Sequence, residues 1–223
     1  MDRDRFSFIA HALIDLANPI SWPTLARACD IAGATAGTRI LDVGCGKAEL
    51  LIRLAEERAC DGVGVERSRL VYAEAMRRVA ARAPAHIRVH LADAREFIAS
   101  LQPASFNLTT CIGSSHALGD ARATLATFKK LTRPGGHIIL GEGYWKKPPS
   151  AQYLKDLGAE ESEMTTHAGN VELGTSLGLV PSWATTATDQ QWDEYEWSYS
   201  RGIEDFVRDH PTDPDAAQML ERS

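Results

Sequence analysis

A glycine pair flanked by carboxylates is the part of this sequence best suited to binding a ligand. Gly44 and Gly46 follow an apolar run that contains Asp42, and glycines at this spacing permit a sharp turn and a close approach of a ligand to the backbone. Glu66 ends the next apolar run, where an acid can accept hydrogen bonds from both hydroxyls of a ribose. Asp93 follows the third run and is placed to accept from an adenine amino group. Each residue alone is weak evidence, and their order along the chain strengthens it.

Two further side chains could act as a general base near such a site. His116 follows the fourth apolar run, and histidine suits proton transfer because its unperturbed pKa lies near neutrality. Glu142 follows the fifth run, where an acid could hold a substrate amine or remove a proton. Tyr144 and Trp145 come next and could stack on an aromatic substrate or shelter a cation. The alternative for all four is a structural role, as caps or as packing residues at the ends of strands and helices.

The N-terminal stretch and the cysteines supply weaker candidates. His11 is a candidate substrate contact, although packing would also explain a lone histidine or the nearby Trp22. The four cysteines form no CxxC pair and are expected to be reduced, with Cys111 a buried thiol rather than a nucleophile. We expect no metal, because magnesium prefers oxygen ligands and Asn107 leaves Glu142 without an obvious carboxylate partner.

Short apolar runs that alternate with amphipathic stretches predict the elements that position these residues. The expected strands cover 39–43, 61–66, 87–91, 106–111 and 136–141, with 179–184 as a candidate sixth, and helices are expected over 48–58 and 69–81. Strands that alternate with helices indicate βαβ units, and hence an α/β fold with a doubly wound, mainly parallel, Rossmann-like sheet and helices on both faces. Ligands of such sheets bind beyond the carboxyl ends of the strands, near the point where the strand order reverses.

The segments on either side of this core are expected to be helical. We predict an N-terminal helical lid over 1–36, the α/β core over 37–142, and a segment on the substrate side over 143–223 with C-terminal helices, all within one domain. An aromatic and apolar stripe recurs at helical spacing in the last segment, at Trp192, Tyr195, Tyr199, Ile203 and Phe206. It indicates a core-facing helix or, alternatively, an aromatic wall of a substrate pocket.

With these motifs in order, residues 37–142 resemble class I S-adenosylmethionine-dependent methyltransferases of the small-molecule type. The resemblance implies S-adenosyl-L-methionine as cofactor and methyl transfer to a small-molecule acceptor, with His116 or Glu142 as the base where one is needed. The cofactor contacts that it implies are Asp42 with the methionine part, the main chain of Gly44, Cys45 and Gly46 beneath that part and the ribose, Glu66 with the ribose, Arg67, Asp93 and Ala94 with the adenine, and Cys111 and Ile112 beside the methyl donor. On the acceptor side we expect Tyr144, Trp145 and His11.

The chain departs from this family's pattern in three places. Ala48 stands at the third glycine position, and Asn107 stands where an aspartate is usual. The family's last, antiparallel strand has no candidate in this sequence. A protein that binds S-adenosylmethionine without catalysis therefore stays open as an alternative. A nicotinamide dehydrogenase is less favoured, because Glu49 breaks the GxGxxG pattern and the acids before and after the glycines are not explained.

Composition and charge limit the remaining classes. The chain has 223 residues, of which 44% are hydrophobic and 24% charged, as is ordinary for a globular domain. No signal peptide is recognisable and no apolar run approaches the ~20 residues of a membrane span, so we expect a cytoplasmic protein. The net charge of −6 divides into +5 for residues 1–150 and −11 for residues 151–223, without the dense basic stripe that nucleic acids require. The acidic last third is either a solvated surface or a cover that favours neutral or cationic acceptors.

Overall fold

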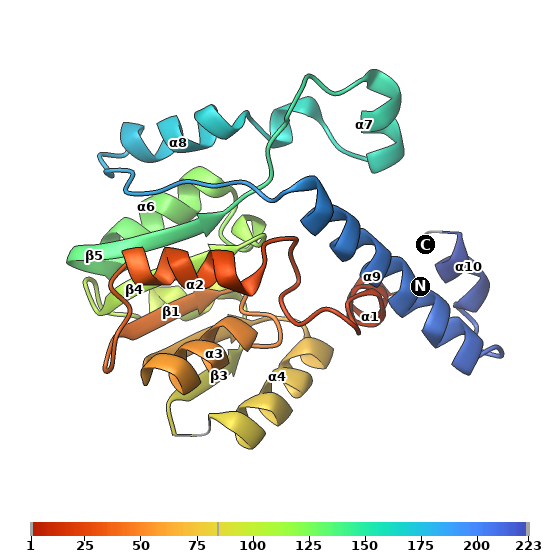
Figure 1. Ribbon diagram of the computed structural model, residues 1–223, viewed down its shortest axis with the longest axis horizontal. Helices are drawn as coiled ribbons and strands as arrows, with labels where there is room; N and C mark the ends of the chain where they lie inside the picture. Colours follow the sequence, from red (N-terminus) through yellow and green to blue (C-terminus); the bar gives the residue numbers. More distant parts are fainter. Residues whose placement is uncertain (1, 84, 222–223) are drawn as a thin grey trace.

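A five-stranded sheet forms the centre of the computed structural model, which describes residues 2–83 and 85–221 (Figure 1). The expected segments 1–36 and 143–223 thus extend by one and two residues beyond the described ones. Each strand is parallel to its neighbours, in the order β3-β2-β1-β4-β5. The strands are β1 (Arg39–Val43), β2 (Asp61–Glu66), β3 (Ile87–Leu91), β4 (Phe106–Ile112) and β5 (Thr132–Gly141). The order reverses between β1 and β4, which places a ligand crevice beyond their carboxyl ends.

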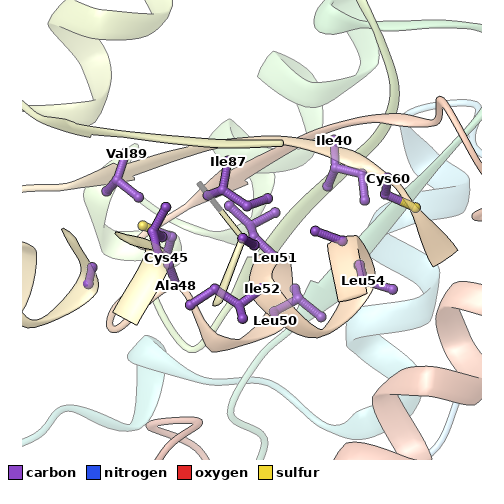
Figure 2. Packing of buried hydrophobic residues seen from close by; sticks show 14 of the residues in the cluster. Ile40, Cys45, Ala48, Leu50, Leu51, Ile52, Leu54, Cys60, Ile87 and Val89 are labelled. Carbon is purple, nitrogen blue, oxygen red and sulfur yellow. The ribbon is translucent and has the colours of Figure 1, made fainter. Parts of the chain in front are cut away.

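Helices cover both faces of this sheet, as the sequence predicted. The α-helices are α1 (Arg3–Ala10), α2 (Trp22–Ile31), α3 (Glu49–Arg58), α4 (Arg69–Arg82), α5 (Ala94–Ala99), α6 (Ala121–Leu131), α7 (Ala151–Leu157), α8 (His167–Ser176), α9 (Asp189–Asp209) and α10 (Ala216–Leu220), with short 3-10 turns η1 (Ser115–Ala117) and η2 (Glu161–Glu163). Successive side chains of β1 point to opposite faces. Ile40 therefore packs in a cluster with α2, α3 and α4, part of which Figure 2 shows, whereas Leu41 packs in another with α5 and α6.

The observed elements begin and end close to the predicted ones, with two corrections. The helix expected from residue 48 begins at Glu49, because Ala48 is its N-cap and adopts a left-handed conformation with φ 61°. The fifth strand begins at Thr132 rather than at residue 136. Thr132 already pairs with Phe106, and the register then shifts before His137 pairs with Leu108. The stretch Pro134-Gly135-Gly136 thus forms an irregularity inside the strand.

The candidate sixth strand at 179–184 was wrong. In the structure this stretch is irregular and lies on the way from α8 to α9. Pro181 has no N–H to donate to a neighbouring strand, and the Val180 side chain is 88% exposed, so neither a ladder nor a core holds it as a strand. The described part of the sheet therefore ends at β5.

Three helices from the two ends of the chain form a cap, defined here as α1, α9 and α10. They lie on the side of the sheet toward which the strand arrows point (Figure 1). Their contact is a small apolar cluster of their own around Ile9, Ala10, Ile203 and Met219. Arg5 of α1 also pairs with Asp213 and with Asp215 beside α10. The predicted core-facing stripe of α9 thus packs mainly against α1 and α10 rather than against the sheet.

Candidate active site

The loop between β1 and α3 is built so that a ligand can reach its backbone. Gly44 and Gly46 adopt positive φ values of 70° and 55°, which side chains with a Cβ resist. A Cβ on Gly44 would collide with the side chain of Ser114, whereas a Cβ on Gly46 would meet no heavy atom within 4 Å. The loop therefore packs closely against the end of β4 at one glycine and stays open at the other.

Glu66 at the end of β2 is held in place by this loop. Its Oε2 accepts a hydrogen bond from the Gly46 N–H at 3.2 Å, and its Oε1 accepts one from the Ser68 N–H at 2.7 Å. Each carboxylate oxygen has two acceptor sites, so the two that remain can receive the hydroxyls of a ribose. The carboxylate expected to bind the ribose is thus held next to Gly46, whose main chain is expected to lie beneath the ribose.

Asp42 near the end of β1 is a buried carboxylate that borders the same loop. It is only 4% exposed, and its Oδ1 accepts from the Thr110 hydroxyl of β4 at 2.7 Å. Burial raises its pKa to about 7, with a smaller contribution from the charge of Glu66, whereas the Thr110 hydrogen bond acts in the opposite direction. A ligand cation nearby would stabilise its ionised form, as expected for a contact with the methionine part.

A cleft of about 290 Å³ lies beyond the carboxyl ends of β1, β2, β3 and β4. Its lining residues are Gly44, Val65, Glu66, Arg67, Ala92, Asp93, Ala94, Arg95, Ser114, His116 and Ala117. Five of the predicted cofactor residues and the candidate base His116 therefore come together there. Asp93 also caps α5, because its Oδ1 accepts from the Arg95 N–H at 2.8 Å.

Other predicted cofactor residues lie beneath this cleft rather than on its wall. The Cys45 side chain packs in the core cluster of α3, close to Gly64 of β2, so only its main chain is available to a ligand (Figure 2). Cys111 is fully buried, and burial raises the pKa of its thiol to about 12. The expectation of a buried thiol is confirmed. Ile112, beside it, pairs with Gly141 at the end of β5.

Glu142 lies where β4 and β5 end side by side. Its Oε1 accepts from the Gly143 N–H at 3.1 Å. Its Oε2 is buried and has no hydrogen-bond partner among the residues that the structure describes. The charges of Asp42 and Glu142 both add to the rise in the pKa of the buried Cys111 thiol, so both carboxylates lie near that residue. An orphaned carboxylate oxygen is thus located near the expected methyl-donor end of the site.

The predicted acceptor residues Tyr144 and Trp145 make their contacts within the segment that follows β5. Tyr144 forms an isolated bridge with Thr165 and an edge-on ring contact with His167. The indole of Trp145 donates to the Glu161 carbonyl oxygen at 2.9 Å and meets the Tyr153 ring edge-on. These contacts anchor α7 and α8 after the sheet, and a direct contact with an acceptor stays a prediction.

His11 at the end of α1 is held by both of the longer cap helices. Its Nδ1 lies 2.7 Å from the Ser7 carbonyl oxygen, so Nδ1 carries the proton and Nε2 accepts from the Tyr195 hydroxyl of α9 at 3.0 Å. Burial lowers the pKa of His11, with a contribution from the charge of Lys47, which favours this neutral form. Tyr195 was expected only as one member of the α9 stripe, and its pairing with His11 across 184 positions had no local signal.

The cleft wall also includes Arg95 and Ser114. Ser114, two residues after β4, could be expected from the sequence to bind a substrate or to cap the next helix, whereas Arg95 in the first turn of α5 was not singled out. Within residues 2–83 and 85–221, no group of three or more His, Cys, Asp or Glu side chains could hold a metal ion. In the same ranges, no helix combines the length and the apolar character that a membrane crossing requires.

Comparison with known proteins matches this geometry. A family model described as "Methyltransferase domain" covers residues 34–201. The chain is 26% identical to YjhP of Escherichia coli (strain K12), over 98% of this chain and 88% of that protein.

Two solved structures of S-adenosylmethionine-dependent methyltransferases, both in complex with S-adenosyl-L-homocysteine, share the fold. The one from Thiobacillus denitrificans is 25% identical with a TM-score of 0.88, over 100% of this chain and 90% of that one. The one from Geobacter sulfurreducens is 24% identical with a TM-score of 0.89, over 98% and 88%. The Gly46 cradle, the Glu66 carboxylate and the buried Asp42 fit the same cofactor. The chain therefore belongs to the methyltransferase domain family and is a methyltransferase that uses S-adenosylmethionine.

Proposed function

We propose that this enzyme methylates a small molecule that carries an amine or a hydroxyl group, by in-line displacement. The observation that carries the proposal is the buried Glu142 Oε2, which lacks a partner among the described residues. A buried acceptor left without a donor costs about 1–3 kcal/mol, and more if it is charged. An acceptor N–H or O–H that donates to this oxygen would remove that cost and would orient the reacting atom.

The roles of the residues follow from their places at the edge of the sheet. S-adenosylmethionine supplies a methyl group bonded to a positively charged sulfur. Glu66 and the Gly44–Gly46 main chain hold the nucleoside end, and Asp42 faces the methionine end. Glu142 holds the acceptor amine or takes the proton of an acceptor that arrives protonated. Alignment of the two reactants and exclusion of water can supply about 7–11 kcal/mol of the barrier, so a base is an addition to this effect.

His116 is the second candidate for the base. It lines the cleft together with Asp93 and Arg95, which belong to the expected adenine end. This neighbourhood supports a cofactor contact for His116, whereas the neighbourhood of Cys111 and Asp42 supports an acceptor contact for Glu142.

The net charge of −11 in residues 151–223 supports an uncharged or cationic small molecule over a nucleic acid as acceptor, since a negative surface repels phosphates.

A screen of amines, alcohols and thiols with methyl-labelled S-adenosylmethionine tests the proposal. Amines or alcohols are expected among the best acceptors, and Glu142→Gln is expected to lower kcat by about 10²–10⁴-fold for those that arrive protonated. Glutamine keeps the shape of the glutamate side chain, so the Glu142→Gln protein should bind S-adenosylhomocysteine with the affinity of the wild type. His116→Gln is the matched variant on the cleft wall. Full activity of Glu142→Gln would contradict the role of this residue, and an absence of turnover with any acceptor would favour a non-catalytic binding protein.

A further inference from the structure

Lys47 is buried in the glycine loop, and its ammonium group binds the turn that follows α1. The residue is 7% exposed. Its Nζ donates to the main-chain carbonyl oxygens of His11, Ala12 and Ile14 at 2.7, 3.3 and 2.9 Å. An ammonium group has three N–H donors, so these three acceptors satisfy it completely. The turn after α1 is thereby fixed to the loop that approaches the cofactor.

Packing alone does not explain a charged side chain in this place. Burial lowers the pKa of Lys47, because desolvation disfavours the ammonium form. Asp15, Glu49 and Glu74 offset part of that effect through their charge. A methionine would fill the same space without a desolvation cost, but it could not bind three carbonyl oxygens. The lysine therefore provides directed contacts between two parts of the molecule.

These two parts have separate apolar cores. The cap helices α1, α9 and α10 share their own cluster, distinct from the two clusters that cover the sheet. Leu16 of the turn after α1 packs against the apolar cluster of α3, and polar contacts attach this turn to the core as well: besides Lys47, Asp15 pairs with Arg78 at 2.7 Å and with Arg53 at 3.9 Å. Arg53 and Arg78 lie on α3 and α4, whereas Lys47 makes its hydrogen bonds from the loop between β1 and α3, which approaches the cofactor.

A continuous path of contacts leads from the ribose carboxylate to the cap. Glu66 accepts from the Gly46 N–H, and Lys47, the next residue, donates to the His11 carbonyl oxygen. The ring of His11 in turn binds the Tyr195 hydroxyl of α9. We propose that Lys47 is a positioning residue that couples cofactor binding at Glu66 to the placement of α1 and α9. Cofactor binding fixes the loop, the loop fixes the direction of Lys47, and Lys47 holds His11 and, through the His11 ring, Tyr195 in place.

Hydrogen exchange of the full chain, with and without saturating S-adenosylhomocysteine, tests this coupling without any acceptor. In the wild type the ligand is expected to slow exchange in α1 and α9 by about 5- to 150-fold, the usual range of coupling between sites. In Lys47→Met this slowing should be lost, while the slowing at the end of β2 persists. Because coupling is reciprocal, the affinity for S-adenosylhomocysteine in calorimetry should fall by the factor that is lost in exchange.

A matched control separates this role from a general effect of removing a lysine. Lys129 also donates to a main-chain carbonyl oxygen, that of Leu177 at 2.6 Å, but it lies on α6, so Lys129→Met should keep the full coupling. If Lys47→Met does not fold, Lys47→Arg keeps the charge, but its planar guanidinium cannot direct three bonds in the same way, so coupling should be reduced. Undiminished slowing of exchange in the folded Lys47 variant would overturn the proposal. So would a loss of slowing with unchanged ligand affinity, which a merely structural role predicts.

Discussion

Lowering the pH is expected to weaken ligand binding through Asp42. Its pKa is about 7 in the ligand-free protein, because the carboxylate is buried, and an ammonium group of the ligand should lower that pKa in the complex. With Asp42 ionised throughout in the complex, the dissociation constant of S-adenosylhomocysteine should rise about eightfold between pH 7.5 and pH 6.0, because at the lower pH the ligand must displace a proton from Asp42. The ligand's α-amino group belongs to a free amino acid and is more basic than a peptide N-terminus, so it stays largely protonated over this range.

Isothermal titration calorimetry in buffers of different ionisation enthalpy measures both the affinity and the protons released. Release of about 0.9 proton per ligand is expected near pH 6.0. Asp42→Asn removes the titrating group and keeps the shape of the side chain, so its weaker affinity should vary little over the same range. His116→Gln removes the histidine of the cleft wall and should keep the pH dependence. A pH-independent affinity of the wild type, or an unchanged slope in Asp42→Asn, would refute the reasoning.

The same shift has a consequence for stability, with its own sign. The folded-state pKa of Asp42 lies above its ordinary value of 3.8, so the folded protein binds more protons than the unfolded chain between these two values. The contribution of Asp42 to the free energy of unfolding therefore falls as the pH rises from about 4 to about 7. We expect Asp42→Asn to raise the Tm of the ligand-free protein at pH 8 while weakening ligand binding there.

Three further changes test the site. Glu66→Ala should lower cofactor affinity about 10- to 150-fold in calorimetry, since it removes charge-assisted hydrogen bonds, and the circular dichroism spectrum should stay unchanged; an unchanged affinity would exclude Glu66 as the ribose contact. Gly44→Val should abolish binding and lower Tm, because valine resists a positive φ and its Cβ would collide with Ser114; a wild-type Tm would contradict the observed loop. If the acids of residues 151–223 recruit cationic acceptors, added salt should raise the acceptor KM with little change in kcat, because salt screens charges beyond about 8 Å. A better affinity for carboxylate acceptors than for cationic ones would argue against this recruitment.

The first three strands were predictable because each one is a short apolar run that ends at a glycine, an acid or a polar turn. Glu66 and Asp93 were predictable as site residues for the same reason, since the carboxyl ends of parallel strands meet at one edge. The stretch at 179–184 has the same local signal as a strand. Nothing local indicates that Pro181 and the exposed Val180 would keep it away from the sheet.

Contacts between distant parts of the chain were outside the reach of local patterns. The pairing of His11 with Tyr195 depends on how α1 and α9 pack, and both helices are amphipathic in ways that fit several partners. The orphaned Glu142 Oε2 depends on the ends of two strands and on the segment after β5. Sequence reasoning placed Glu142 at the correct edge of the sheet, but only the packing shows that one of its oxygens is buried without a donor.

The glycine loop explains how one short segment serves the core, the ligand and the cap at once. Left-handed residues at 44, 46 and 48 alternate with ordinary ones, and each left-handed residue turns the direction of the next side chain. Cys45 therefore points into the core, Gly46 leaves open space, and Lys47 reaches the turn after α1. Ala48 keeps φ 61° although it has a Cβ, at a cost of about 1–3 kcal/mol that persists only where the surroundings fix the backbone. The buried Ala48 and Cys45 supply that fixation, so the packing of the core sets the direction in which Lys47 leaves the loop.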